Sequence, residues 1–95
     1  MKKKNVWYDS TTYSRGDTER KPTCWTFDTG VLQITVVSGH RDYPGEWVIH
    51  CYQVGFNALR MKITTEKPAE YAQNLALKMV RMKLKMMIDS LPEEQ

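Results

Sequence analysis

Residues 68–91, PAEYAQNLALKMVRMKLKMMIDSL, determine the architecture of this chain, because their apolar side chains recur with the spacing of one long amphipathic helix. When successive residues are placed about 100° apart, these side chains fall into two neighbouring stripes. The first stripe consists of Tyr71, Leu75, Met79, Met82 and Met86, and the second stripe of Leu77, Val80, Leu84, Met87, Ile88 and Leu91. A small sheet covers only one side of a helix, so the pattern predicts that a second surface also needs to be buried.

A narrow polar strip runs along the same predicted helix. Asn74, Lys78, Arg81 and Lys85 recur at i, i+4, i+7 and i+11, which places them together on one cationic edge. Lys83 falls within the apolar arc, where its alkyl chain can lie along a hydrophobic surface and its ammonium group can reach water or an acid. The predicted helix therefore combines a wide apolar surface with a basic edge.

The segments before the helix alternate between apolar and polar residues, as strands do. Residues 23–27 and 31–37 flank the turn sequence Asp28-Thr29-Gly30 and predict a hairpin. After a polar loop, residues 46–53 predict a third strand, and residues 59–64 predict a fourth. The short connections favour antiparallel neighbours. We therefore expect an α+β fold: a small antiparallel meander of three to four strands, packed on one face by a single long C-terminal helix.

The alternation also assigns side chains to the two faces of the sheet, because successive residues of a strand point to opposite sides. The residues expected to face the helix are Leu32, Ile34, Val36, Trp47, Ile49, Cys51, Leu59, Met61 and Ile63. The residues expected on the opposite, open face are Gln33, Thr35, Val48, His50, Tyr52, Arg60 and Lys62. The open face thus mixes aromatic, β-branched and cationic groups.

A chain of 95 residues allows one domain. Residues 1–21 are dominated by polar and basic side chains and are expected to form a flexible arm, from which residues 5–8 dock as a short edge strand through Trp7. Residues 22–91 form the α+β domain, and residues 92–95 an acidic tail that follows Asp89. Arg15-Gly16-Asp17, in the arm, is interpreted as turn chemistry rather than as an adhesion motif.

Composition and charge restrict the class of protein. The net charge of +3 and the pI near 8.9 are too low to make nucleic-acid binding the default interpretation. No apolar run approaches the roughly 18–20 residues of a membrane span, so we expect a soluble, cytoplasmic protein without a membrane partner. Cys24 and Cys51 lack the spacing of a zinc or redox motif and are expected to be buried free thiols.

Residue types suited to acid–base chemistry gather around one loop, but their spacing does not predict an enzyme. His40, Asp42, Tyr43 and Glu46 lie in this loop, and His50 and Cys51 follow on the next strand. Consecutive strand residues point to opposite faces, so His50 and Cys51 do not cooperate. A metal site built from Cys24, His40, His50 and Cys51 has none of the usual zinc spacings. We therefore expect no catalytic residue, no metal, no cofactor and no small-molecule substrate.

Two surfaces are candidates for binding. The second stripe of the helix, Leu77, Val80, Leu84, Met87, Ile88 and Leu91, is predicted to form a partner or dimer interface, in which twofold packing of two helices buries it most simply. A charged surface that could contact nucleic acid comprises His50, Tyr52, Arg60 and Lys62 on the sheet and Lys78, Arg81 and Lys85 on the helix.

These sequence features support two functions, one preferred and one alternative. The first is a non-enzymatic protein-binding module, a homodimer with a macromolecular protein target, acting as a phage or mobile-element accessory protein that inhibits a host defence or nucleic-acid-handling complex. The alternative is a direct binder of single-stranded DNA or RNA, which stacks bases on Tyr52 and His50 of the open sheet face.

Overall fold

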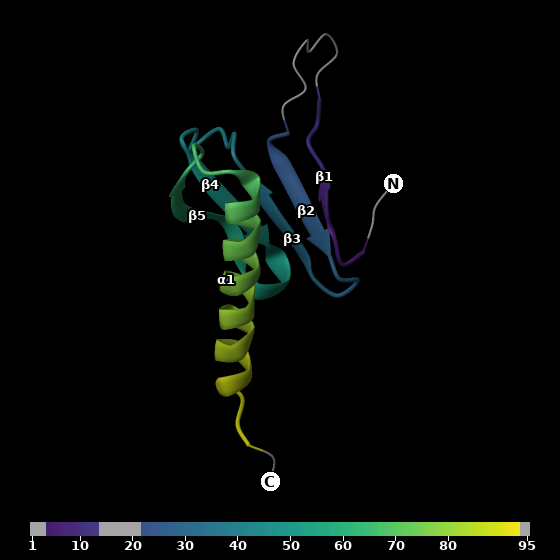
Figure 1. Cartoon of the computed structure of the whole chain (residues 1–95). Coiled ribbons are helices and arrows are strands. Elements are labelled where there is room, and N and C mark those ends of the chain that lie inside the picture. The colour runs from purple at the N-terminus through teal and green to yellow at the C-terminus, as the bar shows by residue number, and fades with distance from the viewer. Residues whose placement is uncertain (1–3, 14–21, 94–95) are drawn as a thin grey trace.

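Five antiparallel strands and one long helix form the part of the chain that the computed structural model describes, residues 4–13 and 22–93 (Figure 1). The sheet keeps the chain order, β1-β2-β3-β4-β5. The elements are β1 (Trp7–Asp9), β2 (Cys24–Asp28), β3 (Gln33–Val37), β4 (Glu46–Cys51), the 3₁₀ turn η1 (Tyr52–Val54), β5 (Phe56–Thr64) and α1 (Ala69–Asp89). The predicted α+β meander with one C-terminal helix is confirmed, with five strands in place of three to four.

The additional strand is β1, which lies in the predicted N-terminal arm. Trp7 is opposite Phe27 of β2, and the centres of their rings are 5.4 Å apart. The Asn5 backbone N–H donates to the Asp28 carbonyl over 2.8 Å. The docking expected through Trp7 is thus observed, because the indole is too large and apolar to leave in water. The sheet begins before residue 22, and the other parts of the arm, residues 1–3 and 14–21 with Arg15-Gly16-Asp17, lie outside the described residues.

Local turn chemistry fixes the register of the β2–β3 hairpin. Gly30 has a φ of 91°, which glycine adopts without the steric cost of a Cβ atom. Its N–H donates to the Asp28 side chain over 2.8 Å, and the Leu32 N–H donates to the Thr29 hydroxyl over the same distance. The resulting register aligns β2 with β3 so that Phe27 lies opposite Ile34, on the face towards the helix.

The core lies between the sheet and the first half of α1. The helix contacts β3, β4, β5 and η1, and its central contact residues, Ala72 and Ala76, are fully buried and small enough to let it approach closely. Trp47 of β4 is buried, and its indole N–H donates to the Lys67 carbonyl just before α1 over 3.3 Å. The predicted inner face is buried as expected at Ile34, Val36, Trp47, Ile49, Cys51 and Met61.

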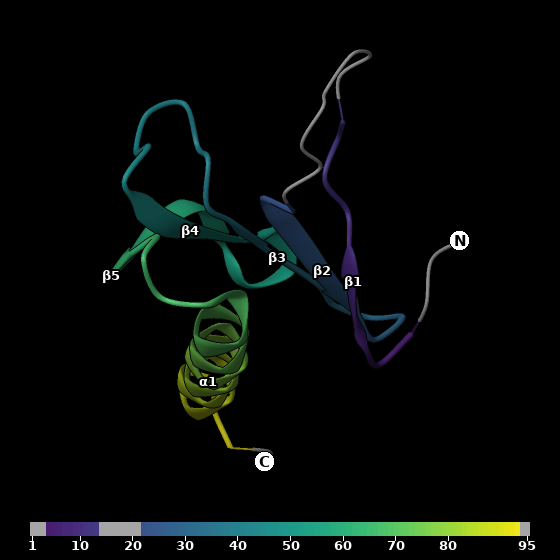
Figure 2. The same ribbon diagram turned by 45° about the horizontal axis from the view of Figure 1, so that its top comes forward.

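Two expectations about the faces need correction. Leu59 is opposite Ile49 but remains 40% exposed, because β5 is an edge strand whose pairing is irregular and which contains positive φ angles at Ala58 and Lys62. Val48 lies on the predicted open face, yet it is fully buried. The loop of residues 38–45 rises on the side of the sheet away from α1 (Figure 2), and its His40 and Tyr43 rings contact His50 and Arg60 on that side. The outer face is therefore partly covered.

Candidate functional sites: a groove beside the helix and a cluster on the outer face

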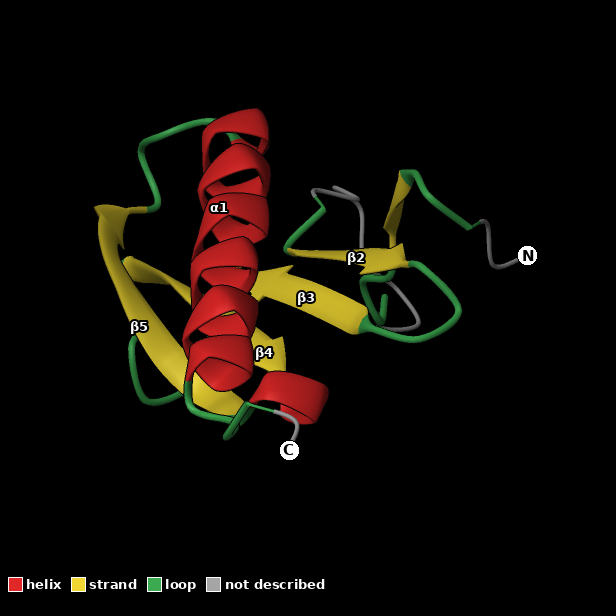
Figure 3. Ribbon diagram, turned by 90° about the horizontal axis from the view of Figure 1, so that it is seen from below, coloured by secondary structure: helices red, strands yellow, loops and turns green. Residues whose placement is uncertain are grey.

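An apolar groove separates α1 from the strands that it does not cover. In Figure 3 the helix lies in front of β3, β4 and β5, while β2 lies to one side. The groove between them has a volume of about 530 Å³. It is lined by Phe27, Thr29, Leu32 and Ile34 from the sheet side, and by Leu77, Val80, Arg81, Leu84, Lys85 and Ile88 from the helix. The groove thus has apolar walls on both sides and two cationic residues on the helix.

The helix residues of the groove belong to the second stripe of the predicted interface. Val80 is only 3% exposed, because it continues the line of Ala72 and Ala76 into the core, so it is not available to a partner. Leu77 and Leu84 are half-buried against the core. The exposed part of the stripe lies at the end of the helix and consists of Met87, Ile88 and Leu91. The second stripe is therefore a surface at its C-terminal end and a groove wall in its middle.

The end of α1 extends past the ends of the strands (Figure 1). Ile88 is 67% exposed there. The helix stops at Ser90, whose hydroxyl donates to the Met87 carbonyl over 2.7 Å. Apolar side chains at this end of the helix are thus exposed and contribute little to the core.

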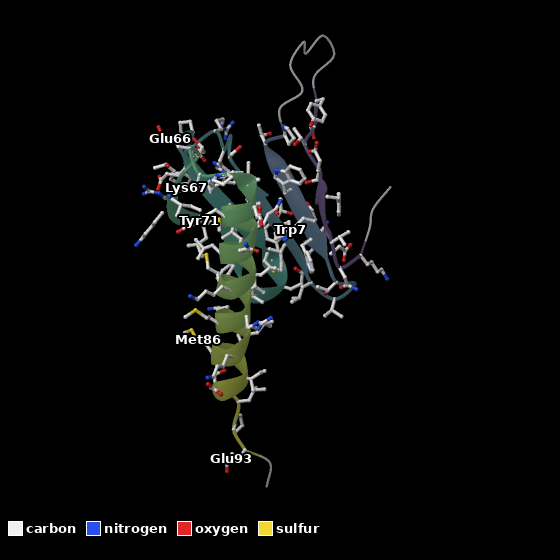
Figure 4. All side chains as sticks on the ribbon, viewed as in Figure 1. Trp7, Glu66, Lys67, Tyr71, Met86 and Glu93 are labelled. Carbon is white, nitrogen blue, oxygen red and sulfur yellow. The ribbon has the colours of Figure 1, made fainter. Side chains whose placement is uncertain are left out.

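The first stripe lies on the opposite flank of the helix, so the prediction that the two stripes are neighbours is wrong. Met86 is 64% exposed and points away from β1 and β2, as its place relative to Trp7 shows (Figure 4). A smaller hollow of about 270 Å³ is lined by Phe56, Met79, Met82, Lys83 and Met86. Both flanks of α1 thus present apolar surface, and Lys83 lies within it, as its position in the apolar arc predicted.

The predicted charged surface is divided between two faces of the molecule. Lys78, Arg81 and Lys85 are exposed on α1, where Arg81 and Lys85 border the groove. His50, Tyr52, Arg60 and Lys62 belong to the other side of the sheet or its rim, and Tyr52 is displaced from the expected strand into η1. The structure therefore does not unite these seven residues into one site.

Rings and charges gather on the outer face in a cluster of His40, Tyr43, Glu46, His50, Tyr52 and Arg60, here called the outer-face cluster. The His40 ring stacks on those of Tyr43 and His50, with centroid distances of 5.5 and 6.0 Å. The Tyr52 ring lies 6.0 Å from His50. The Arg60 guanidinium lies 5.1 Å from the centre of the Tyr43 ring and 2.6 Å from a Glu46 carboxylate oxygen. Arg60 is thus already engaged within the chain.

The outer-face cluster brings His40 to His50, a contact that the sequence did not predict. The two residues are ten positions apart, and only the path of the loop between β3 and β4 decides that their rings meet. The clustering of polar and aromatic residues in residues 40–46 was the one sequence signal that pointed to this region. It could not show which of them would meet β4.

The geometry does not assemble a nucleophilic or metal-binding site from these residues. Cys51 is buried on the helix side of the sheet, and this burial raises the pKa of its thiol, the opposite of what a reactive thiolate needs. Cys24 and Cys51 are free thiols; Cys51 is buried as expected, whereas Cys24 is only partly buried. Within residues 4–13 and 22–93, no three His, Cys, Asp or Glu side chains lie close enough together to hold a metal ion.

Comparison with protein-family models, with curated proteins and with solved structures finds no match to this chain. Among the helices of the described residues, none combines the length and the apolar character that crossing a membrane requires.

Proposed function

We propose that this protein is a non-enzymatic, homodimeric protein-binding module, and that the groove beside α1 binds the helix of a second copy. One observation carries the proposal: the same chain has an apolar groove of about 530 Å³ and, next to it, an exposed apolar helix end. Each copy can then give its helix end and receive that of its partner. Such an exchange is closed by a twofold axis and stops at two copies.

The second stripe suggests how the two helices pack. Leu84 is midway between Leu77 and Leu91 along the stripe. Antiparallel packing therefore places Leu84 at the twofold axis, against its counterpart, and the Leu91 of each copy near the Leu77 of the other. In this arrangement Ile88 leaves water and enters the partner's groove.

Charge supports a second copy as the occupant. Arg81 and Lys85 border the groove, whereas Asp89 and Glu93 lie at the helix end that is expected to approach it. Acids at a helix C-terminus oppose the helix dipole, and α1 has no basic residue in its last turn. Arg81 and Lys85 of a partner would offset this unfavourable interaction of the acids with the dipole. The basic groove of one copy and the acidic helix end of the other are therefore complementary in charge.

Molar mass measured by light scattering tests the proposal with a matched pair of variants. Ile88→Lys is expected to raise the dissociation constant of the dimer by at least about tenfold, because both copies lose an apolar side chain from the interface. Met86→Lys is the control, since Met86 is similarly exposed, at 64% against 67%, but lies on the other flank of α1. The control is expected to remain a dimer.

A wild-type protein that is monomeric at all accessible concentrations would rule out the dimer. Equal effects of the two lysine substitutions would show that α1 associates through a different flank. Either result overturns the assignment of the groove.

For the target of the dimer we keep the expectation from the sequence: a larger protein complex of a host cell, inhibited by an accessory protein of a phage or mobile element acting in the cytoplasm. The first stripe supports a protein target, because the exposed Met82 and Met86, with the half-buried Met79 beside them, form an adaptable apolar surface on the flank that the dimer leaves open. Two free thiols support a reducing compartment.

A direct binder of single-stranded nucleic acid is the second candidate, favoured by one observation: Tyr52 is 69% exposed and adjoins the His50 ring. The support is weaker, because Glu46 and Tyr43 already engage Arg60. Lys62 is the other cation predicted for this face, and it is exposed. Base stacking on Tyr52 predicts that Tyr52→Ala weakens binding of a single-stranded oligonucleotide by roughly 1–3 kcal/mol.

The measurement is fluorescence anisotropy with labelled single-stranded DNA and RNA over a range of salt concentrations. Tyr52→Phe, which keeps the ring, is the matched control and is expected to bind as the wild type does. Binding that is absent, or that does not weaken as salt rises, would eliminate this candidate.

A further inference from the structure

We propose that His40 and His50 form a pH-sensitive latch, which holds the loop of residues 38–45 on the outer face of the sheet near neutral pH and releases it on acidification. The latch is independent of the proposed dimer, because it lies on the face of the sheet opposite α1. It assigns a regulatory role to the outer-face cluster.

Both histidines use Nδ1 as a hydrogen-bond acceptor. The Asp42 backbone N–H donates to Nδ1 of His40 over 3.1 Å, and the Ala58 backbone N–H donates to Nδ1 of His50 over 3.2 Å. An imidazole that accepts at Nδ1 is neutral and carries its proton on Nε2. Protonation places a second proton on Nδ1, which then cannot accept, so each protonation breaks one of these hydrogen bonds.

The Ala58–His50 hydrogen bond and the ring stack connect three elements, whereas the Asp42–His40 hydrogen bond lies within the loop. His40 belongs to the loop, His50 to β4, and Ala58 to β5. Ala58 has a φ of 52°, a conformation that is unfavourable for a residue with a Cβ atom, so it depends on its surroundings to remain there. Loss of its hydrogen bond to His50 removes one of these supports. The His40–His50 stack at 6.0 Å is one of the contacts between the loop and the sheet. The Glu46 N–H also donates to the Tyr43 carbonyl, and the Thr65 N–H to the Gly45 carbonyl, each over 3.2 Å, so release concerns the part of the loop around His40.

The charges around His50 do not favour its protonated form. From the loop, the neighbours are Tyr43 and the Asp42 carboxylate, which lies 3.8 Å from the Arg41 side chain. From β4 and β5, the Glu46 carboxylate is engaged by Arg60, whose positive charge lies in the same cluster. From β3 and η1, the neighbours are the uncharged side chains of Thr35 and Tyr52. Two imidazolium rings at this distance would also repel one another.

The pKa of His50 agrees in direction with this geometry. Burial, and then the positive charge that His40 can acquire, lower the pKa of His50 below its ordinary value. A histidine whose pKa is lower in the folded state binds fewer protons there than in the unfolded chain. Its contribution to stability is thus complete above the unfolded pKa and is lost as the pH falls through the folded pKa. The loop is held at neutral pH and released on the acidic side.

The experiment is an NMR titration of the full chain between about pH 7.5 and pH 5, the range in which histidines change charge. The amide of Ala58 is expected to shift together with the His50 ring to which it donates, and the amide of Asp42 together with the His40 ring. Hydrogen exchange of residues 38–45 and 57–59, corrected for the intrinsic effect of pH, is expected to accelerate at the acidic end of this range, because the hydrogen bonds to the histidines are lost there.

The matched variant is the double substitution His40→Asn and His50→Asn, which keeps an acceptor near each Nδ1 position but cannot be protonated. Its corrected exchange in these segments is expected to be the same at both ends of the pH range. Unchanged exchange in the wild type would overturn the latch, and so would an equal acceleration in the double variant. If the variant does not fold, His40 and His50 rings that titrate without any response of the Asp42 and Ala58 amides would overturn it as well.

Discussion

Replacing Leu84 with lysine is expected to raise the dissociation constant of the dimer by about two to four orders of magnitude. In antiparallel packing Leu84 meets its counterpart at the twofold axis, so the substitution places two like charges in contact. Like charges juxtaposed across an interface cost several kcal/mol, and each 1.4 kcal/mol changes the constant tenfold. Sedimentation equilibrium of the variant and the wild type measures the difference directly.

A charge-swap experiment separates this effect from a defect in folding. Leu84→Asp alone is expected to be monomeric as well, whereas an equimolar mixture of the Leu84→Lys and Leu84→Asp proteins is expected to recover dimers through the opposite charges. Because Leu84 also packs against the core, circular dichroism of each variant checks that α1 still forms. A mixture that stays monomeric, although both proteins are folded, would contradict the placement of Leu84 at the axis.

Replacing Trp47 with alanine is expected to lower the free energy of unfolding by about 3–5 kcal/mol, the usual cost of removing a large buried aromatic side chain. Trp47 is buried in the core, and its indole N–H donates to the Lys67 carbonyl immediately before α1. The substitution therefore leaves a cavity and also removes a tie between β4 and the start of the helix. For a domain with a total stability of about 5–15 kcal/mol, this is a large fraction.

Urea unfolding, followed by circular dichroism at one fixed protein concentration, measures this loss, because the apparent stability of a dimer depends on concentration. Trp7→Ala is the matched control: it removes the same side chain from β1, at the edge of the sheet, where the indole is only half-buried. The control is expected to lose clearly less stability than Trp47→Ala. Equal losses in the two variants would mean that the core is not centred on β4 and α1.

The residues that the sequence located correctly are those whose position follows from a local rule. The turn Asp28-Thr29-Gly30 fixes the hairpin through hydrogen bonds within a few residues, and the helix follows from its own periodicity. Alternation placed Ile49 inside and His50 outside because a strand has only two faces. Val48 and Leu59 departed from this rule, since burial also depends on what covers each face.

The candidate sites were predicted less completely than the fold. The second stripe was recognised as an apolar surface, but its division into a buried residue, Val80, a groove wall and an exposed end could not be read from a helical wheel. A wheel gives the angles between side chains of one helix. It does not show where the strands end along the helix axis or that β2 lies to one side of α1.

The amino-acid sequence by itself therefore determined the order and type of the main elements, the inner face of the sheet and the excess of apolar surface on α1. These properties arise from interactions between near neighbours in the chain. Only the tertiary structure decided that the helix stops short of β2 and leaves a groove, and that the loop of residues 38–45 brings His40 to His50. Both depend on contacts between segments far apart in the sequence, whose relative positions no local spacing specifies.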